Sequence, residues 1–194
     1  MRLAIALFEG AEELDWAGPW EVLAAWAQLR PADGVEVVTV AETLDPVRCA
    51  KGLRVLAERT WEELGHVDVL VYPGGQGTRA QLGDERIRER MRALARAGTL
   101  ITSVCTGALV LADAGLLDGR PATTHWASLE LLATLGDGIE VRPDARFVDD
   151  GEVITAAGVS AGIDVALHLI GRLHSSERSV EVARYIQYDP GPAA

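Results

Sequence analysis

Four short apolar runs constrain the fold of this chain more than any other feature. They are LAIALF (residues 3–8), VEVVTV (35–40), VDVLVYP (67–73) and TLITSV (99–104). A strand with one face in water alternates apolar and polar residues, whereas a strand covered on both faces is apolar almost throughout. The runs therefore predict buried strands of a mainly parallel sheet.

Helical patterns separate these runs. The segment Pro19–Leu29 starts with a proline, which suits the first turn of a helix. The segment 84–97 has Ile87, Met91 and Leu94 on one face, and a glycine follows it as a stop signal. Strands that alternate with helices predict a doubly wound α/β sandwich.

The remaining segments extend this pattern. Residues 45–56 contain a proline and a Lys-Gly turn, which predicts a small hairpin beside the main sheet. Residues 123–136 predict a helix, 147–157 two strands joined at Asp-Gly, and 160–173 a long apolar helix. Because no linker, repeat or low-complexity segment divides the chain, we expect one domain spanning residues 1–194.

Charge and hydropathy exclude several classes of protein. Acidic residues outnumber basic ones by 29 to 18, giving a net charge of −11, and no basic stripe is available for nucleic acid. No apolar run approaches the ~20 residues of a membrane helix. The N-terminal apolar stretch is shorter than the roughly 7–15 residues of a signal peptide. We therefore expect a cytoplasmic protein that binds neither nucleic acid nor membrane.

The two cysteines, Cys49 and Cys105, predict reduced thiols rather than a disulfide framework. With no CxxC and four scattered histidines, a metal site has little support. The sequence also lacks the glycine spacing of phosphate-binding and dinucleotide-binding loops, so no nucleotide cofactor is indicated. Cys49 lies in the predicted hairpin, and we assign it no catalytic role.

Cys105 lies where an apolar strand runs directly into a helix, in S-V-C-T-G. This pattern resembles the nucleophile elbow of hydrolases, which projects a reactive side chain at the carboxyl ends of parallel strands. The start of a helix favours thiolate, so we expect a pKa below the ~8.5 of a free cysteine, although an ionised Asp15 would raise it. From position alone, a small buried hydrophobic side chain is an equal alternative.

Two other segments follow parallel strands and are expected at the same edge. In PGGQG, the N–H groups of Gly74 and Gly75 could donate to negative charge on a substrate, or the glycines could only form a turn. In GAEELD, Asp15 is the carboxylate nearest the expected helix start, ahead of Glu12 and Glu13. The alternatives, which we favour for Glu12 and Glu13, are a solvated acidic loop or a carboxylate that contacts the N–H groups at that helix start.

Several longer segments together resemble the ThiJ/PfpI superfamily, and within it the isocyanide hydratases. They are LDWAGPWEVL (14–23), YPGGQG (72–77), SVCTGALVLADAGLLDGRPATTHW (103–126), AAGVSAGIDVAL (156–167) and YIQYDPGPAA (185–194). The resemblance covers nearly the whole chain. It implies a flavodoxin-like α/β sandwich with a cysteine nucleophile elbow, a homodimer, and no metal or organic cofactor.

The resemblance also implies an activity and three catalytic residues. Members of that branch are hydro-lyases that convert a small apolar isocyanide to an N-substituted formamide. The carried-over roles are Cys105 as nucleophile, Asp15 as acid/base and Thr106 as a hydrogen-bonding partner. A thiolate that adds to the isocyanide carbon would form a thioimidate, which splits the hydration into two easier steps. For Thr106, a role at the helix start is an equal alternative.

Other positions distinguish this chain from related branches. Peptidase-like and glyoxalase-like members place histidine directly after the cysteine, where this chain has Thr106. We expect His125 to be a structural, hydrogen-bonded side chain and His168 to serve packing or lie on the surface. Trp16 and Trp126 could wall an apolar substrate pocket, or serve core or dimer packing.

Two rival functions use the same residues. One is a ligand-sensing or redox-sensing module, since AraC-type regulators carry a similar domain before a DNA-binding helix-turn-helix. The chain has no basic helical extension after this region, which disfavours a regulator. The other is a carbonyl-stress protein of the glyoxalase or deglycase type that uses the same cysteine.

Overall fold

The computed structural model describes residues 1–189 and contains a central sheet of seven strands. The sheet order is β10-β11-β7-β6-β1-β2-β5, and only β10 and β11 pair in antiparallel fashion. The strands are β1 (Arg2–Ala6), β2 (Glu36–Ala41), β5 (Arg59–Thr60), β6 (Val69–Tyr72), β7 (Leu100–Val104), β10 (Phe147–Asp149) and β11 (Val153–Ala156). The predicted mainly parallel sheet is confirmed.

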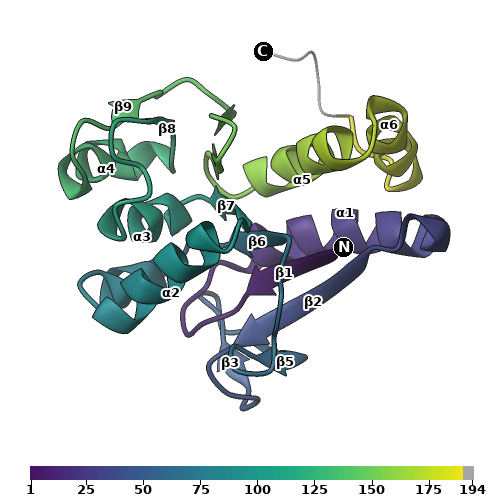
Figure 1. Ribbon diagram of the computed structural model, residues 1–194, viewed down its shortest axis with the longest axis horizontal. Helices are drawn as coiled ribbons and strands as arrows, with labels where there is room; N and C mark the ends of the chain where they lie inside the picture. Colours follow the sequence, from purple (N-terminus) through teal and green to yellow (C-terminus); the bar gives the residue numbers. More distant parts are fainter. Residues whose placement is uncertain (190–194) are drawn as a thin grey trace.

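Helices cover both faces of this sheet (Figure 1). One layer contains α1 (Glu13–Leu29), α5 (Ala161–Leu173) and α6 (Ser176–Tyr185). The other contains α2 (Glu85–Arg96), α3 (Gly107–Asp113) and α4 (Leu129–Leu135). Three short 3-10 segments, η1 (Pro31–Asp33), η2 (Gln76–Gln81) and η3 (Trp126–Ser128), connect these elements.

The two faces of each central strand enter different hydrophobic cores. Along β1, Leu3 and Ile5 pack in the core that includes α1 and α5, whereas Ala4 and Ala6 pack in the core on the side of α2 and α3. All four side chains are buried. This two-sided burial explains why the predicted strands are apolar almost without a break.

The smaller predicted elements are also found. The hairpin consists of β3 (Val47–Arg48) and β4 (Arg54–Val55), which pair in antiparallel fashion. The Asp-Gly turn joins β10 to β11 as expected. A short parallel pair, β8 (Pro121–Ala122) with β9 (Glu140–Val141), and helix α6 were not predicted. In α6 only Val182 and Ala183 are buried.

Helix α1 begins at Glu13, so the predicted start at Pro19 is wrong. Acidic side chains at Glu13 and Asp15 suit the positive end of a helix. Pro19 lacks the N–H that would reach the carbonyl of Asp15, but its ring packs closely against α5 at Gly162. Tertiary packing therefore keeps the proline inside the helix, and Asp15 lies in the first helical turn rather than in a loop.

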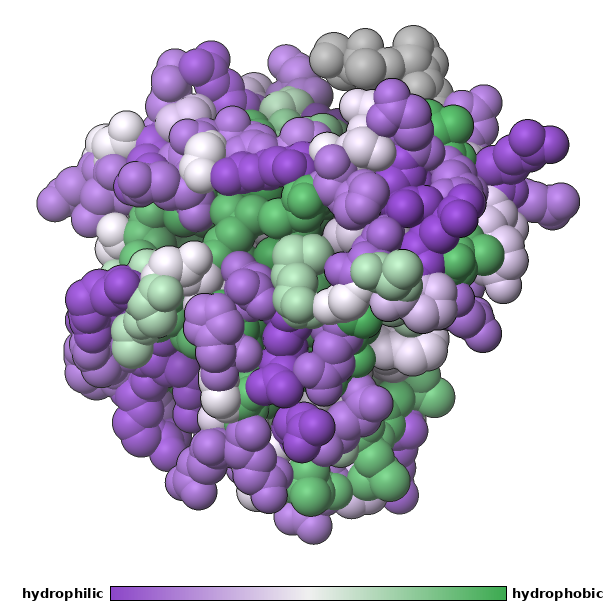
Figure 2. Space-filling view, turned by 45° about the vertical axis from the view of Figure 1, so that its right-hand side comes forward, coloured by the Kyte–Doolittle hydropathy of each residue, from purple (hydrophilic) through white to green (hydrophobic). Residues whose placement is uncertain are grey.

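Much of the outer surface is hydrophilic on the face that Figure 2 shows, with apolar areas between the hydrophilic residues. Within residues 1–189, none of the helices has the length and apolar character needed to cross a membrane.

Candidate active site

Cys105 occupies a strained turn between β7 and α3. Its φ of +56° lies in the left-handed region, which non-glycine residues rarely adopt. The Cys105 N–H lies 3.1 Å from the carbonyl oxygen of Ala156 and 2.9 Å from that of Ala157, and the Thr124 hydroxyl donates to the Cys105 carbonyl at 2.7 Å. At Gly107 an added Cβ would lie 2.3 Å from the carbonyl oxygen of Tyr72. These contacts hold the predicted elbow in place.

The loops that follow β1 and β6 meet beside this elbow. The Glu12 N–H donates to the Gly74 carbonyl at 2.9 Å, and Ala11 forms an isolated β-bridge with Gly75. The sequence prediction that these segments share the carboxyl edge of the sheet is therefore confirmed.

Asp15 is fully buried against this edge. Its Oδ2 accepts a hydrogen bond from the Gly74 N–H at 2.9 Å. Its Oδ1 accepts from no nitrogen or oxygen donor among residues 1–189. The carboxyl group and the Cys105 thiol are close enough for each to shift the pKa of the other. Among the described residues, Oδ1 thus has no nitrogen or oxygen donor that would compete with the neighbouring thiol.

Burial shifts the titration of both groups upward. Burial raises the pKa of Asp15 to about 7, although the Gly74 N–H and the thiol partly oppose the shift. Burial and the neighbouring Asp15 charge raise the pKa of Cys105 to about 11, against the N–H groups of Thr106 and Val159. The predicted lowering of the Cys105 pKa is therefore wrong, because desolvation of a buried thiol outweighs two backbone donors.

The two pKa values define one proton shared by two groups. Between about pH 7 and pH 11 the Asp15–Cys105 pair carries a single negative charge and a single proton. Either the carboxyl or the thiol holds that proton. Such a pair can supply a nucleophilic sulfur and a proton donor at the same time.

Thr106 ties the elbow to the glycine turn. Its Oγ1 accepts from the Gly75 N–H at 2.9 Å and lies 3.1 Å from the Thr78 hydroxyl, which donates to it. Thr106 is the N-cap of α3, but its side chain makes no cap hydrogen bond. The Thr106 hydroxyl therefore contacts Gly75 and Thr78 and does not cap α3, which was the alternative role expected from the sequence.

The N–H groups of Gly74 and Gly75 are already occupied within the protein. Gly74 donates to Asp15 and Gly75 donates to Thr106, so the expectation that they donate to a substrate does not fit this geometry. The backbone donors at the thiol are those of Thr106 and Val159. Val159, with a φ of +44°, was not identified from the sequence, because its N–H approaches Cys105 only through the tertiary fold.

A cavity of about 210 Å³ opens beside the thiol. Mostly polar residues surround it. They are Glu12, Gly75, Gln76, Arg79, Cys105, Thr106, His125, Ala127, Ser128 and Val159. Gln76, Arg79 and Ser128 were not predicted from the sequence, although Gln76 lies within PGGQG and Arg79 follows that segment by two positions.

The two tryptophans expected to wall the pocket lie elsewhere. Trp126 is 77% exposed, and its ring centroid lies 5.4 Å from that of its neighbour His125. Trp16 lines a different hollow, together with Trp20 and Leu56. Neither tryptophan lines the cavity at Cys105, because α1 turns Trp16 toward the hairpin and η3 presents Trp126 to solvent.

His168 takes the expected packing role, whereas His125 has the expected hydrogen bond but also reaches the cavity at Cys105. His125 Nδ1 accepts from the Ala127 N–H at 3.2 Å, so the neutral ring carries its proton on Nε2. The ring also lines the cavity and lies against Gly158. His168 Nε2 lies 2.7 Å from Asp149, and its ring packs on Phe147.

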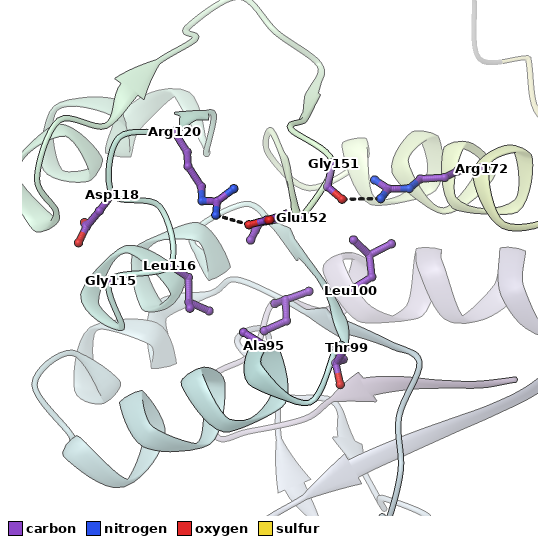
Figure 3. A pocket seen from close by; sticks show the side chains of 13 residues that line it. Ala95, Thr99, Leu100, Gly115, Leu116, Asp118, Arg120, Gly151, Glu152 and Arg172 are labelled. Carbon is purple, nitrogen blue, oxygen red and sulfur yellow. Dashed lines mark hydrogen bonds and ion pairs between the residues drawn. The ribbon is translucent and has the colours of Figure 1, made fainter.

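A larger hollow of about 530 Å³ lies at the amino ends of β7 and β11, at the opposite edge of the sheet from Cys105. Figure 3 shows Arg120 directed toward Glu152 and Arg172 toward the Gly151 carbonyl. Arg120 also pairs with Asp150 at 2.8 Å. These arginines are occupied in holding the β10–β11 turn. Within the described residues no group of three or more potential ligands could hold a metal ion.

Comparison with known proteins assigns the chain to a family. The model of the DJ-1/PfpI family matches residues 1–172, and the chain belongs to that family. Isonitrile hydratase from Pseudomonas putida is 38% identical over 192 residues, which cover 99% of this chain and 80% of that protein. A ThiJ/PfpI family protein from Pseudomonas syringae superposes with a TM-score of 0.86 at 32% identity, covering 100% of this chain and 77% of that structure.

A third relative has a different kind of function. The HTH-type transcriptional regulator CdhR from Pseudomonas aeruginosa is 35% identical over 139 residues. The match covers 71% of this chain but only 40% of the regulator. The chain is therefore similar to an enzyme over nearly its full length and to a regulator over a part.

Proposed function

We propose that this protein is an isocyanide hydratase-like enzyme, a hydro-lyase that uses Cys105 as its nucleophile. The observation that carries the proposal is the fully buried Asp15 carboxyl beside the Cys105 thiol, at the strained turn between β7 and α3 and next to a cavity. The 38% identity to isonitrile hydratase over 99% of the chain supports the same reaction.

The first chemical step forms a covalent intermediate. The sulfur of Cys105 bonds to the terminal carbon of R–N≡C, and Asp15 delivers to that carbon the proton that came from the thiol. The product of this step is the thioimidate R–N=CH–S–Cys105. No proton enters or leaves the site, because Asp15 only relays the proton from sulfur to carbon.

The second step releases the formamide. Asp15 accepts a proton from water as the hydroxyl oxygen bonds to the thioimidate carbon, and it passes that proton to the nitrogen to give R–NH–CH(OH)–S–Cys105. The carbon–sulfur bond then breaks while Asp15 relays the hydroxyl proton to the sulfur, which gives R–NH–CHO and the Cys105 thiol. Thr106 holds the Gly75 turn against the elbow, and its N–H lies at the sulfur. The sum of both steps is R–NC plus water giving the formamide.

A ligand-sensing module is the second candidate function. It is supported by the similarity to a transcriptional regulator over 71% of the chain. In that case an isocyanide or another small molecule would bind at the cavity without turnover. A carbonyl-stress protein, the other rival, would instead consume methylglyoxal.

The decisive experiment mixes the purified protein separately with an aryl isocyanide, an alkyl isocyanide and methylglyoxal. We expect formamide from the isocyanides, measured by chromatography, and no loss of methylglyoxal. Cys105→Ala should abolish turnover with an unchanged circular dichroism spectrum, because a methyl group cannot form the thioimidate. Cys49→Ser is the matched control and should keep nearly the wild-type rate. A folded Cys105→Ala protein that still hydrates isocyanides would refute the nucleophile.

A further inference from the structure

Arg79 is a cation at the catalytic cavity that has no carboxylate partner within the part of the chain described, residues 1–189. Its guanidinium lies 3.3 Å from the Gly75 carbonyl and 3.4 Å from the Ser128 hydroxyl oxygen, both long hydrogen bonds to neutral groups. By contrast, Arg88, Arg120 and Arg178 each pair with an acidic side chain at 2.6–2.9 Å. Arg79 thus retains donors for a bound molecule.

The other described residues that line the cavity offer Arg79 no free carboxylate. Glu12 is the one carboxylate among the lining residues, and its Oε1 is in contact with the Lys51 ammonium. Gln76, His125 and Ser128 add neutral polar groups. Asp15 does not line the cavity and is fully buried. Arg79 is therefore the one arginine or lysine side chain among the described residues that line the cavity, and it lies on the same cavity as the singly negative Asp15–Cys105 pair.

We propose that Arg79 and Ser128 form an anion subsite, and that the molecule attacked by Cys105 carries a carboxylate. A guanidinium presents parallel N–H donors that match the two oxygens of a carboxylate. The Ser128 hydroxyl accepts from Arg79 and so keeps its own O–H as a further donor. The cavity of about 210 Å³ restricts the ligand to a small molecule. The assignment of a carboxylate-bearing isocyanide as substrate rests on the proposed hydratase function.

The subsite can be tested without any isocyanide. Iodoacetate and iodoacetamide have nearly the same shape, and each loses iodide to the same thiolate, but only iodoacetate carries a carboxylate. Because both reagents react only with the thiolate, the ratio of their rates at Cys105 does not depend on the fraction of thiolate. A change of this ratio between variants therefore reports on recognition of the carboxylate. Rates are measured by mass spectrometry in a Cys49→Ser background, which leaves one cysteine.

Arg79→Gln should lower the iodoacetate-to-iodoacetamide ratio by about five- to tenfold, because a charge-assisted contact is lost. Arg79→Lys should lower it less, since the charge remains. Arg184→Gln is the matched control: it removes the same charge from α6, outside the cavity lining, and should leave the ratio unchanged. Added salt should narrow the difference between the wild-type and Arg79→Gln ratios, because it screens the attraction of Arg79 while it affects the rest of the acidic chain equally in both proteins. Equal ratios in wild type and Arg79→Gln, or an equal fall in Arg184→Gln, would each overturn the subsite.

A second pair of compounds tests the substrate class itself. 4-Isocyanobenzoate and its methyl ester differ in charge, and Arg79→Gln should reduce kcat/KM for the acid relative to the ester by about tenfold. If both are hydrated with a relative kcat/KM that Arg79 does not affect, the carboxylate preference is wrong while the hydratase proposal stands. If neither is hydrated, the hydratase proposal fails and the alkylation ratio alone decides the anion subsite.

Discussion

At the scale of single residues, the chemistry of this protein depends on a carboxyl group and a thiol that are buried together. Asp15 is inaccessible to solvent and Cys105 is 6% exposed. Each charge would raise the free energy of the other, so the pair keeps one proton over a wide pH range. Burial therefore sets the protonation state that the proposed mechanism needs.

Asp15→Asn separates the two halves of the proposed reaction. Asparagine keeps the shape of aspartate but cannot relay a proton, so kcat should fall by about 10²–10⁴-fold. Where solvent protonates the first adduct, a thioimidate should accumulate on Cys105. Intact-protein mass spectrometry would detect a gain equal to the mass of the isocyanide. Near-normal turnover by this variant would rule out Asp15 as the acid/base.

The pH dependence of alkylation tests the raised pKa of Cys105. Only thiolate reacts with iodoacetamide, so the rate should keep rising above pH 8.5 toward the pKa of about 11. In Asp15→Asn the negative neighbour is absent, so the midpoint should move to lower pH and alkylation at pH 8 should accelerate. A wild-type midpoint below 8.5 would contradict the dominance of burial.

The pH dependence of kcat/KM should report the ionisation of Asp15. Because the pair must hold one negative charge, kcat/KM should rise as pH increases through about 7, where Asp15 loses its proton. It should then stay level until Cys105 ionises near 11. A profile measured with a neutral isocyanide checks this, since the substrate itself does not ionise. A flat profile between pH 5 and pH 9 would contradict it.

At the scale of elements, the site depends on how closely the β6–η2 turn approaches the start of α3. An added Cβ at Gly74 would lie 2.4 Å from the Thr106 nitrogen and 2.9 Å from Asp15 Oδ2. The Thr106 hydroxyl closes the same gap by accepting from the Gly75 N–H. Small residues and one hydroxyl thus set the position of the acid relative to the nucleophile.

Substitution of Thr106 tests this contact between elements. Thr106→Val has nearly the same shape but leaves the Gly75 N–H without its partner, which should cost about 1–3 kcal/mol in the free energy of unfolding. Thr106→Ser keeps the hydroxyl and should cost less. Urea denaturation gives both values. If valine and serine behave alike, the hydroxyl contact contributes nothing measurable to the fold.

At the scale of the whole molecule, an apolar hollow suggests where a second copy would bind. Trp20, Val55 and Leu56 line a hollow of about 300 Å³ between α1 and the β3–β4 hairpin. Leu56 is 64% exposed and Trp20 38%. Exposed apolar clusters of this kind are typical of interaction surfaces. We propose that the homodimer expected from the family resemblance forms here.

Leu56→Glu tests the proposed dimer. A carboxylate in a desolvated interface would lack a partner, so the variant should shift the mass measured by light scattering from two chains toward one. Val180→Glu, which changes an exposed residue of α6, is the control and should leave the mass unchanged. A monomeric wild type, or a Leu56→Glu protein that stays dimeric, would contradict this surface.

The sequence by itself determined the architecture of this protein. Strands that are buried on both faces must be apolar almost throughout, so the runs at 3–8, 35–40, 67–73 and 99–104 identified the core of the sheet. The strand–cysteine–helix junction and the glycines of PGGQG located the edge where the site lies. Such features depend on burial and on local backbone geometry, and both restrict the residue types that can occupy a position.

Tertiary structure alone decided the properties that depend on neighbours distant in the chain. The raised pKa of Cys105 comes from burial and from Asp15, 90 positions earlier in the chain. Helix α1 continues through Pro19 because that ring packs on α5. Arg79 lines the cavity because η2 folds over the elbow, and Trp16 does not because α1 points it elsewhere. Electrostatic fields and packing act through space, and therefore no pattern of nearby residues encodes them.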